Sequence, residues 1–176
     1  MKILTNFNRH DIVKLLKGDM NYGVELGVAK GIFSKRMIDS KRFSLFIGID
    51  MYGGDRRHDT SEYKHALISC GLNSNYKLLR MRFDEALDLF EDQSLDFIYV
   101  DGYAHTGEED GKTIFDWYPK LKVGGVMAGD DYHDDWPLVK IAVNNFVEQI
   151  SGELLLTDKV EEIDFCRYPT WAIIKK

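Results

Sequence analysis

The sequence is short of positive charge, and it contains little cysteine. Lysine and arginine total 23 against 29 aspartate and glutamate residues, which gives a net charge of -6. Because nucleic-acid binding depends on clustered Lys and Arg, this balance argues against a nucleic acid as the main partner. The two cysteines, Cys70 and Cys166, lie far apart and lack C-x-x-C spacing, so we interpret them as free thiols in a reducing compartment.

Long apolar runs and linkers are also missing. No run approaches the roughly 20 apolar residues of a membrane span, and the first residues, "MKILTNFNRHD", lack the apolar centre of a signal peptide. We therefore expect a cytoplasmic protein with no membrane partner. Only three prolines occur and no repeat or low-complexity tract is visible, which favours one domain over residues 1–176.

What the sequence does contain is a regular alternation of short apolar runs and helical patterns. Strands are predicted over 22–28, 43–50, 76–81, 95–101, 124–130, 152–158 and 170–176. A helix is predicted after each of the first five, over 31–40, 61–72, 84–90, 108–121 and 137–150. This alternation predicts an α/β fold with a mostly parallel sheet and helices on both faces. The last two strands have no helix between them, so one should run antiparallel at an edge.

The end of the first predicted strand carries the first candidate binding residues, since open α/β sheets bind ligands at the carboxyl ends of their strands. It reads "VELGVAKG", with Glu25, Gly27 and Gly31 in the spacing E-x-G-x-x-x-G. The glycines permit a tight turn before the exposed N–H groups of the next helix. Glu25 would repel a pyrophosphate but accept an ammonium group, which favours a ligand with an amine over a dinucleotide. Glycines that only shape a strand-to-helix turn would give the same pattern.

The next two strand ends extend this candidate site. Asp50 ends the second strand about 20 residues beyond Gly27, where an acid can accept both hydroxyls of a ribose. A turn or helix-capping Asp is the alternative. Arg82 and Phe83 follow the third strand and would lie beside a nucleoside bound over the second, unless they are ordinary surface and core residues.

Carboxylates accumulate after the fourth and fifth strands. Asp101 ends the fourth strand, with His105 on the loop beyond it, and Asp130 and Asp131 end the fifth. Neighbouring strands lie about 4.8 Å apart, so the three carboxylates should surround one point. Such a cluster must take up protons or hold a cation, and oxygen ligands suit Mg²⁺, Mn²⁺ or Ca²⁺. In the alternative, Asp101 contacts a cofactor and Asp130 caps the following helix region.

Taken in order, these motifs resemble class I S-adenosylmethionine-dependent methyltransferases over roughly residues 20–176. "VELGVAKGIFS" is similar to their first motif and "GID" to their second-strand acid. "LDFIYVDGYAH" resembles the D-G-x-H motif of a small-molecule group, and "DWYPKLKVGGVMAGDDY" the L-x-P-G-G and D-D-Y region of metal-dependent sugar and macrolide O-methyltransferases. The resemblance implies a Rossmann-like, doubly wound sheet of seven strands in three layers, in the order 3-2-1-4-5-7-6 with strand 7 antiparallel.

The resemblance also implies roles for the site residues. Glu25, Gly27 and Gly31 would flank the methionine part of S-adenosylmethionine, Asp50 its ribose, and Arg82 and Phe83 its adenine. Asp101, Asp130 and Asp131 would hold Mg²⁺, or Mn²⁺ or Ca²⁺, against the oxygens of the acceptor substrate. His105 would be the general base, with Asp101, a cofactor contact in its own right, as second choice.

The implied activity is metal-assisted methyl transfer to a hydroxyl group of a small molecule. The sequence departs from the family pattern where the base is concerned: His105 follows Asp101 by four residues instead of three, and Ala104 stands where catechol-type enzymes carry Lys. A metal-independent methyltransferase, a nucleotide-cofactor oxidoreductase and a non-catalytic cofactor-binding module remain alternatives. With no sizeable N-terminal cap domain, the substrate would be covered by short loops, by the second subunit of a homodimer, or left partly open.

Overall fold

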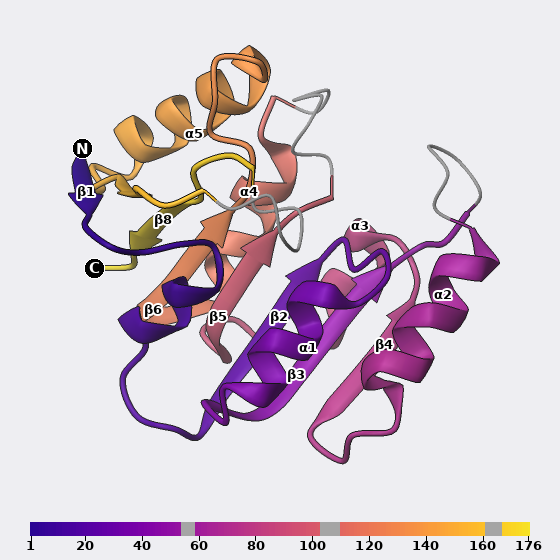
Figure 1. Ribbon diagram of the computed structural model, residues 1–176. Helices are drawn as coiled ribbons and strands as arrows, with labels where there is room; N and C mark the ends of the chain where they lie inside the picture. The colour runs from indigo at the N-terminus through magenta and orange to yellow at the C-terminus, as the bar shows by residue number, and fades with distance from the viewer. Residues whose placement is uncertain (54–58, 103–109, 161–166) are drawn as a thin grey trace.

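The computed structural model describes residues 1–53, 59–102, 110–160 and 167–176, and its strands form one mixed sheet (Figure 1). The strands are β1 (Lys2–Leu4), β2 (Asn21–Leu26), β3 (Phe43–Asp50), β4 (Tyr76–Arg80), β5 (Leu95–Val100), β6 (Leu121–Gly129), β7 (Leu155–Thr157) and β8 (Trp171–Ile174). Their order is β1-β7-β8-β6-β5-β2-β3-β4. Strand β8 runs antiparallel to both of its neighbours, and the other pairs are parallel.

The predicted α/β fold and the antiparallel edge region are confirmed, but the predicted count of seven strands is wrong. The seven expected strands correspond to β2–β8. Strand β1 pairs in parallel with β7 and adds an eighth strand at the edge, so the order of the whole sheet differs from the prediction by that strand. Three residues with a single buried side chain carry too little periodicity to be recognised as a strand.

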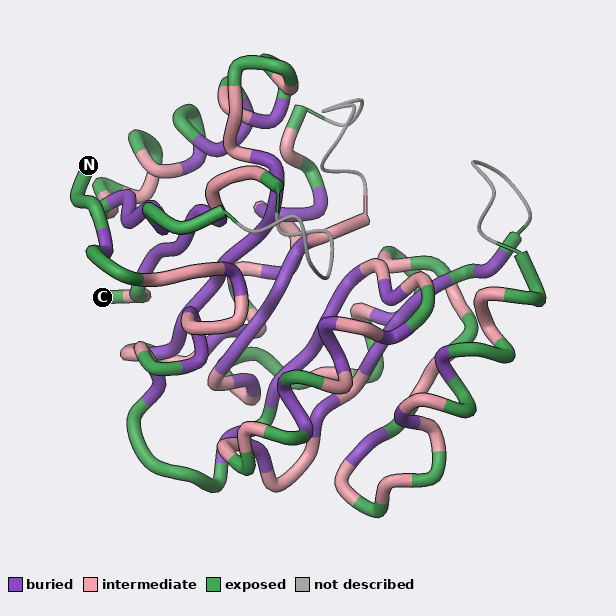
Figure 2. Tube along the Cα trace, viewed as in Figure 1, coloured by how far each residue is buried: buried purple, intermediate pink, exposed green. Residues whose placement is uncertain are grey.

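Helices cover both faces of the sheet. The α-helices are α1 (Ile32–Asp39), α2 (Thr60–Ala66), α3 (Phe83–Ala86), α4 (Lys112–Trp117) and α5 (Pro137–Gln149). Short 3₁₀ or π segments are η1 (His10–Leu15), η3 (Leu67–Gly71), η4 (Leu87–Leu89) and η5 (Tyr118–Lys120). One apolar core packs α4 and α5 against the sheet, and a second packs η1 and α1 against the opposite face. Figure 2 shows the buried residues concentrated in the strands between these layers. None of the described helices is long and apolar enough to cross a membrane.

The sheet brings the carboxyl ends of four parallel strands to one edge. Leu26 at the end of β2 is in register with Ile49 of β3 on one side and Val100 of β5 on the other, and Val100 is in register with Gly129 of β6. The chain leaves β2 toward β3 and β4 and later continues from β5 in the other direction. The β2–β5 boundary is therefore the topological switch point, where open α/β sheets bind ligands.

Candidate functional site

Gly27 forms a tight turn at the end of β2 that presses against the end of β5. Its φ is +96°, and a Cβ at this position would lie 2.7 Å from the backbone oxygen of Asp101. The backbone N–H of Asp101 donates to Leu26 at 2.8 Å, which holds the two strand ends together. Gly31 has φ +79° and begins α1 in the left-handed conformation. Both glycines have a positive φ, which favours glycine. At Gly27 a side chain would also overlap the Asp101 backbone.

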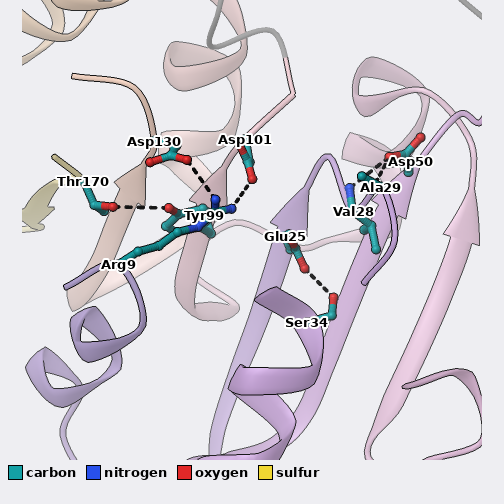
Figure 3. Close-up of polar contacts among 10 residues, drawn as sticks. All are labelled: Arg9, Glu25, Val28, Ala29, Ser34, Asp50, Tyr99, Asp101, Asp130 and Thr170. Carbon is teal, nitrogen blue, oxygen red and sulfur yellow. Dashed lines mark hydrogen bonds and ion pairs between the residues drawn. The ribbon is translucent and has the colours of Figure 1, made fainter. Parts of the chain in front are cut away.

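Asp50 binds the backbone of this turn. Its Oδ2 accepts from the N–H groups of Val28 and Ala29 at 2.9 and 3.0 Å, as Figure 3 shows, and its Oδ1 accepts from Tyr52 at 2.9 Å. The buried Tyr52 hydroxyl in turn donates to the Ala29 carbonyl at 2.8 Å. The structure therefore shows Asp50 binding the turn, and its predicted contact with a ribose stays a prediction. The sequence analysis missed Tyr52, because no motif marks it.

Glu25 lies beneath the turn as a buried carboxyl group. It accepts a hydrogen bond from the Ser34 hydroxyl of α1, which also contacts the Tyr76 hydroxyl at 2.9 Å. Burial raises the pKa of Glu25 well above its ordinary value, and this effect outweighs the Ser34 hydrogen bond. A carboxyl group that is costly to ionise favours a positively charged ligand group nearby, because such a group would stabilise its ionised form.

The acids after β5 and β6 are joined by an arginine from the N-terminal segment. Nη1 of Arg9 lies 2.8 Å from Oδ2 of Asp130, and Nη2 donates to Asp101. The guanidinium carbon also lies 5.0 Å from the ring centroid of Phe33 and 5.1 Å from that of Tyr99. Figure 3 shows the side chain reaching between the two carboxylates. Only 6% of its surface is exposed, so this is a buried ion pair.

The described residues do not form the predicted divalent-metal site at Asp101, Asp130 and Asp131, because Arg9 contacts two of these acids. The described residues include no group of three or more His, Cys, Asp or Glu side chains that could hold a metal ion. The sequence analysis expected the carboxylates to converge and either to take up protons or to hold a cation. The structure places the Arg9 guanidinium between Asp101 and Asp130. Asp131 is buried beside this pair, with φ +61°. The donor set no longer fits Mg²⁺, Mn²⁺ or Ca²⁺, because Arg9 stands between two of the three proposed ligands.

The pKa of Asp130 is strongly raised in the folded protein. Burial raises its pKa from the ordinary 3.8 to about 7, with further upward contributions from Asp101 and Asp131, while Arg9 acts in the opposite direction. The Arg9 guanidinium therefore does not offset the effect of burial on the pKa of Asp130. The site is therefore acidic, and Asp130 changes its protonation near neutral pH.

The remaining predicted residues are placed differently from one another. The ring of Phe83 packs against the backbone of Gly102, just after β5, because a Cβ on Gly102 would overlap that ring. Arg82 stands at the N-cap of α3 and forms an ion pair with Asp84 at the surface, at 2.7 Å, and its predicted contact with the adenine stays a prediction. His105, the predicted base, lies outside the described residues, and its role stays a prediction.

A family model described as a methyltransferase domain matches residues 24–132. No curated protein sequence matches the chain. The fold is similar to that of the N-methyltransferase NodS from Bradyrhizobium japonicum WM9, with a TM-score of 0.65 and 16% identity over 94% of this chain and 92% of that one.

Two other solved structures are similar. One is a protein from Streptococcus mutans, named as a candidate methyltransferase and solved in complex with SAH; its TM-score is 0.67 at 14% identity, covering 95% of each chain. The other is spermidine synthase from Thermotoga maritima, with a TM-score of 0.69 at 15% identity, where the match covers 97% of this chain but 60% of that one. At these identities the likeness shows a shared fold.

Proposed function

Since this chain belongs to the methyltransferase domain family, we propose that it transfers a methyl group from S-adenosylmethionine to a hydroxyl group of a small molecule without a divalent metal. The observation that carries the proposal is the Gly27 turn, pressed against Asp101 and underlain by the buried Glu25. This turn offers a close backbone approach beside acidic groups. S-adenosylmethionine carries an ammonium and a sulfonium group, both of which suit such surroundings, whereas a pyrophosphate does not.

The cofactor contacts are proposed from the same geometry. The turn from Gly27 to Gly31 would flank the methionine part, close to Glu25. Asp50 uses Oδ2 for two amides but Oδ1 for one, so Oδ1 keeps acceptor capacity for a ribose hydroxyl. Phe83, lying on the Gly102 backbone, would stack on the adenine.

The proposed chemistry needs alignment and the removal of one proton. S-adenosylmethionine supplies an electrophilic methyl carbon. The protein must hold the acceptor oxygen in line with it, and such positioning supplies much of the rate. His105 remains our proposed base, because it follows Asp101 by four residues in the sequence. Asp101, the second choice, is less suited, since Arg9 engages its carboxylate and holds it in place.

Ligand binding is the first test. We expect isothermal titration calorimetry to detect binding of S-adenosylhomocysteine but not of NAD⁺. Methyl transfer from labelled S-adenosylmethionine to panels of sugar, phenol and polyketide alcohols, with EDTA present, then tests the reaction. Binding of NAD⁺ in place of S-adenosylhomocysteine would contradict the proposal. Cofactor binding with no acceptor methylated in any panel would instead favour a non-catalytic binding module.

A further inference from the structure

Arg9 is held rigidly by the segment on which it lies. Strand β1 pairs with β7, and beyond it the N–H of Phe7 donates to Asp158 at 3.1 Å while the N–H of Lys159 donates to the Phe7 carbonyl at 2.9 Å. After Arg9, Ile12 of η1 is fully buried in the core. The backbone is therefore anchored on both sides of Arg9, which fixes where its side chain starts.

The position of this guanidinium is the one that a bridging cation would take. Its two terminal nitrogens contact carboxylates from adjacent strand ends, Asp101 after β5 and Asp130 after β6. The faces of Phe33 and Tyr99 cover it. Removing one partner of such a buried pair leaves uncompensated charge, which must then find another counterion or take up protons.

We propose that Arg9 acts as a built-in substitute for a divalent cation, and that removal of its side chain turns Asp101 and Asp130 into ligands for such a cation. Arg9 lies outside residues 24–132, which the family model matches, so the residue that defines the charge of the site comes from the preceding segment. The inference deepens the proposed function, because the Arg9 guanidinium supplies positive charge between Asp101 and Asp130 without a metal. It does not require methyl transfer to be correct, because it is tested by metal binding.

Carboxylate chemistry suggests the best probe for this latent site. Hard divalent cations bind oxygen ligands, and Mg²⁺ gives up its water reluctantly, so Mn²⁺ is the more informative ion. Truncating Arg9 to Ala would leave a space bordered by Asp101 and Asp130, with the buried Asp131 beside it. Arg9→Lys keeps one positive charge but loses the planar fork that spans two carboxylates.

The experiment measures Mn²⁺ binding by the electron paramagnetic resonance signal of the free ion, without cofactor. We expect no stoichiometric site in the wild type and one in Arg9→Ala, with an affinity at least about 100-fold higher than any wild-type binding, as expected when carboxylate ligands lose their counterion. Adding Asp130→Asn to Arg9→Ala should abolish that site. Arg42→Ala is the matched control, because Arg42 pairs with the exposed Asp19 away from the cluster.

Thermal unfolding provides a second measurement. Mn²⁺ should raise the melting temperature of Arg9→Ala but leave those of the wild type and Arg42→Ala unchanged. If Arg9→Ala is unfolded alone, millimolar Mn²⁺ should restore its folding. A stoichiometric Mn²⁺ site in the wild type would overturn the inference, as would an Arg9→Ala protein that neither binds Mn²⁺ nor folds in its presence. Failure of S-adenosylhomocysteine to bind the wild type would overturn only the proposed function.

Discussion

Replacing Asp130 with Asn should change how the stability of the protein depends on pH. In the folded protein the pKa of Asp130 is raised from 3.8 to about 7, mainly by burial. A carboxyl group whose pKa is raised by folding is protonated in the folded state while still ionised in the unfolded state. Folding then takes up a proton, so this group stabilises the protein at low pH, and the contribution is lost as the pH rises toward 7.

The size of the effect follows from the two pKa values. With 3.8 for the unfolded chain and about 7 for the folded one, Asp130 contributes about 3 kcal/mol more stability at pH 5 than at pH 8. Asparagine does not titrate. The free energy of unfolding of the wild type minus that of Asp130→Asn should therefore be about 3 kcal/mol more positive at pH 5 than at pH 8.

Urea unfolding of both proteins at pH 5, 6, 7 and 8 measures this difference directly. Arg9 is charged throughout this range, and groups that titrate alike in both proteins cancel. Asp134→Asn is the matched control: Asp134 is exposed, pairs with Lys140, and has its pKa lowered by that lysine, so its contribution should be flat from pH 5 to 8. A wild-type minus Asp130→Asn difference that does not vary with pH would refute the reasoning.

Three further predictions concern the Gly27 turn, Asp50 and the need for a divalent metal. Gly27→Ala should cost about 3 kcal/mol in unfolding free energy and weaken S-adenosylhomocysteine binding at least about 10-fold, because the methyl group meets the Asp101 backbone. Gly124→Ala, with φ +81° but open space, should cost about 1 kcal/mol and leave binding unchanged; equal losses of binding would contradict this account. Asp50→Ala should weaken calorimetric S-adenosylhomocysteine binding at least about 10-fold, since three amides lose their acceptor; undiminished affinity would remove Asp50 from the site. Dialysis against EDTA should leave the methyl-transfer rate within about twofold of its starting value, and a loss restored by Mn²⁺ would show that a metal takes part.

The sequence predicted those features that depend on local periodicity and on strand ends. The apolar runs of β2, β3, β5 and β6 are long enough to be recognised. Because parallel strands end at one edge, the convergence of Asp101 and Asp130 could be inferred without coordinates. The turn at Gly27 was likewise readable, since a glycine at a strand-to-helix junction has few other reasons to be there.

The features that the sequence did not reveal are orientations and distant partners. Nothing in "GID" tells whether the Asp50 carboxylate faces a ligand or the Val28 amide. Arg9 lies in a polar segment without periodicity, 121 residues from Asp130. A charge argument could have found it: carboxylates that must be neutralised, in a chain with a net charge of -6, direct attention to each unassigned Arg.

The pairing of β1 with β7 joins the first strand of the chain to one that comes near its end. During synthesis Arg9 leaves the ribosome long before Asp130 and before Leu155, with which Lys2 is paired. Until β7 has been made and has docked, β1 has no neighbour in the sheet, and the acids at the ends of β5 and β6 lack the guanidinium that neutralises them. Contacts between such distant segments are slow to form, because the loop between them must close first. The cluster of Arg9, Asp101 and Asp130 is therefore expected to be among the last parts of the protein to reach its final structure.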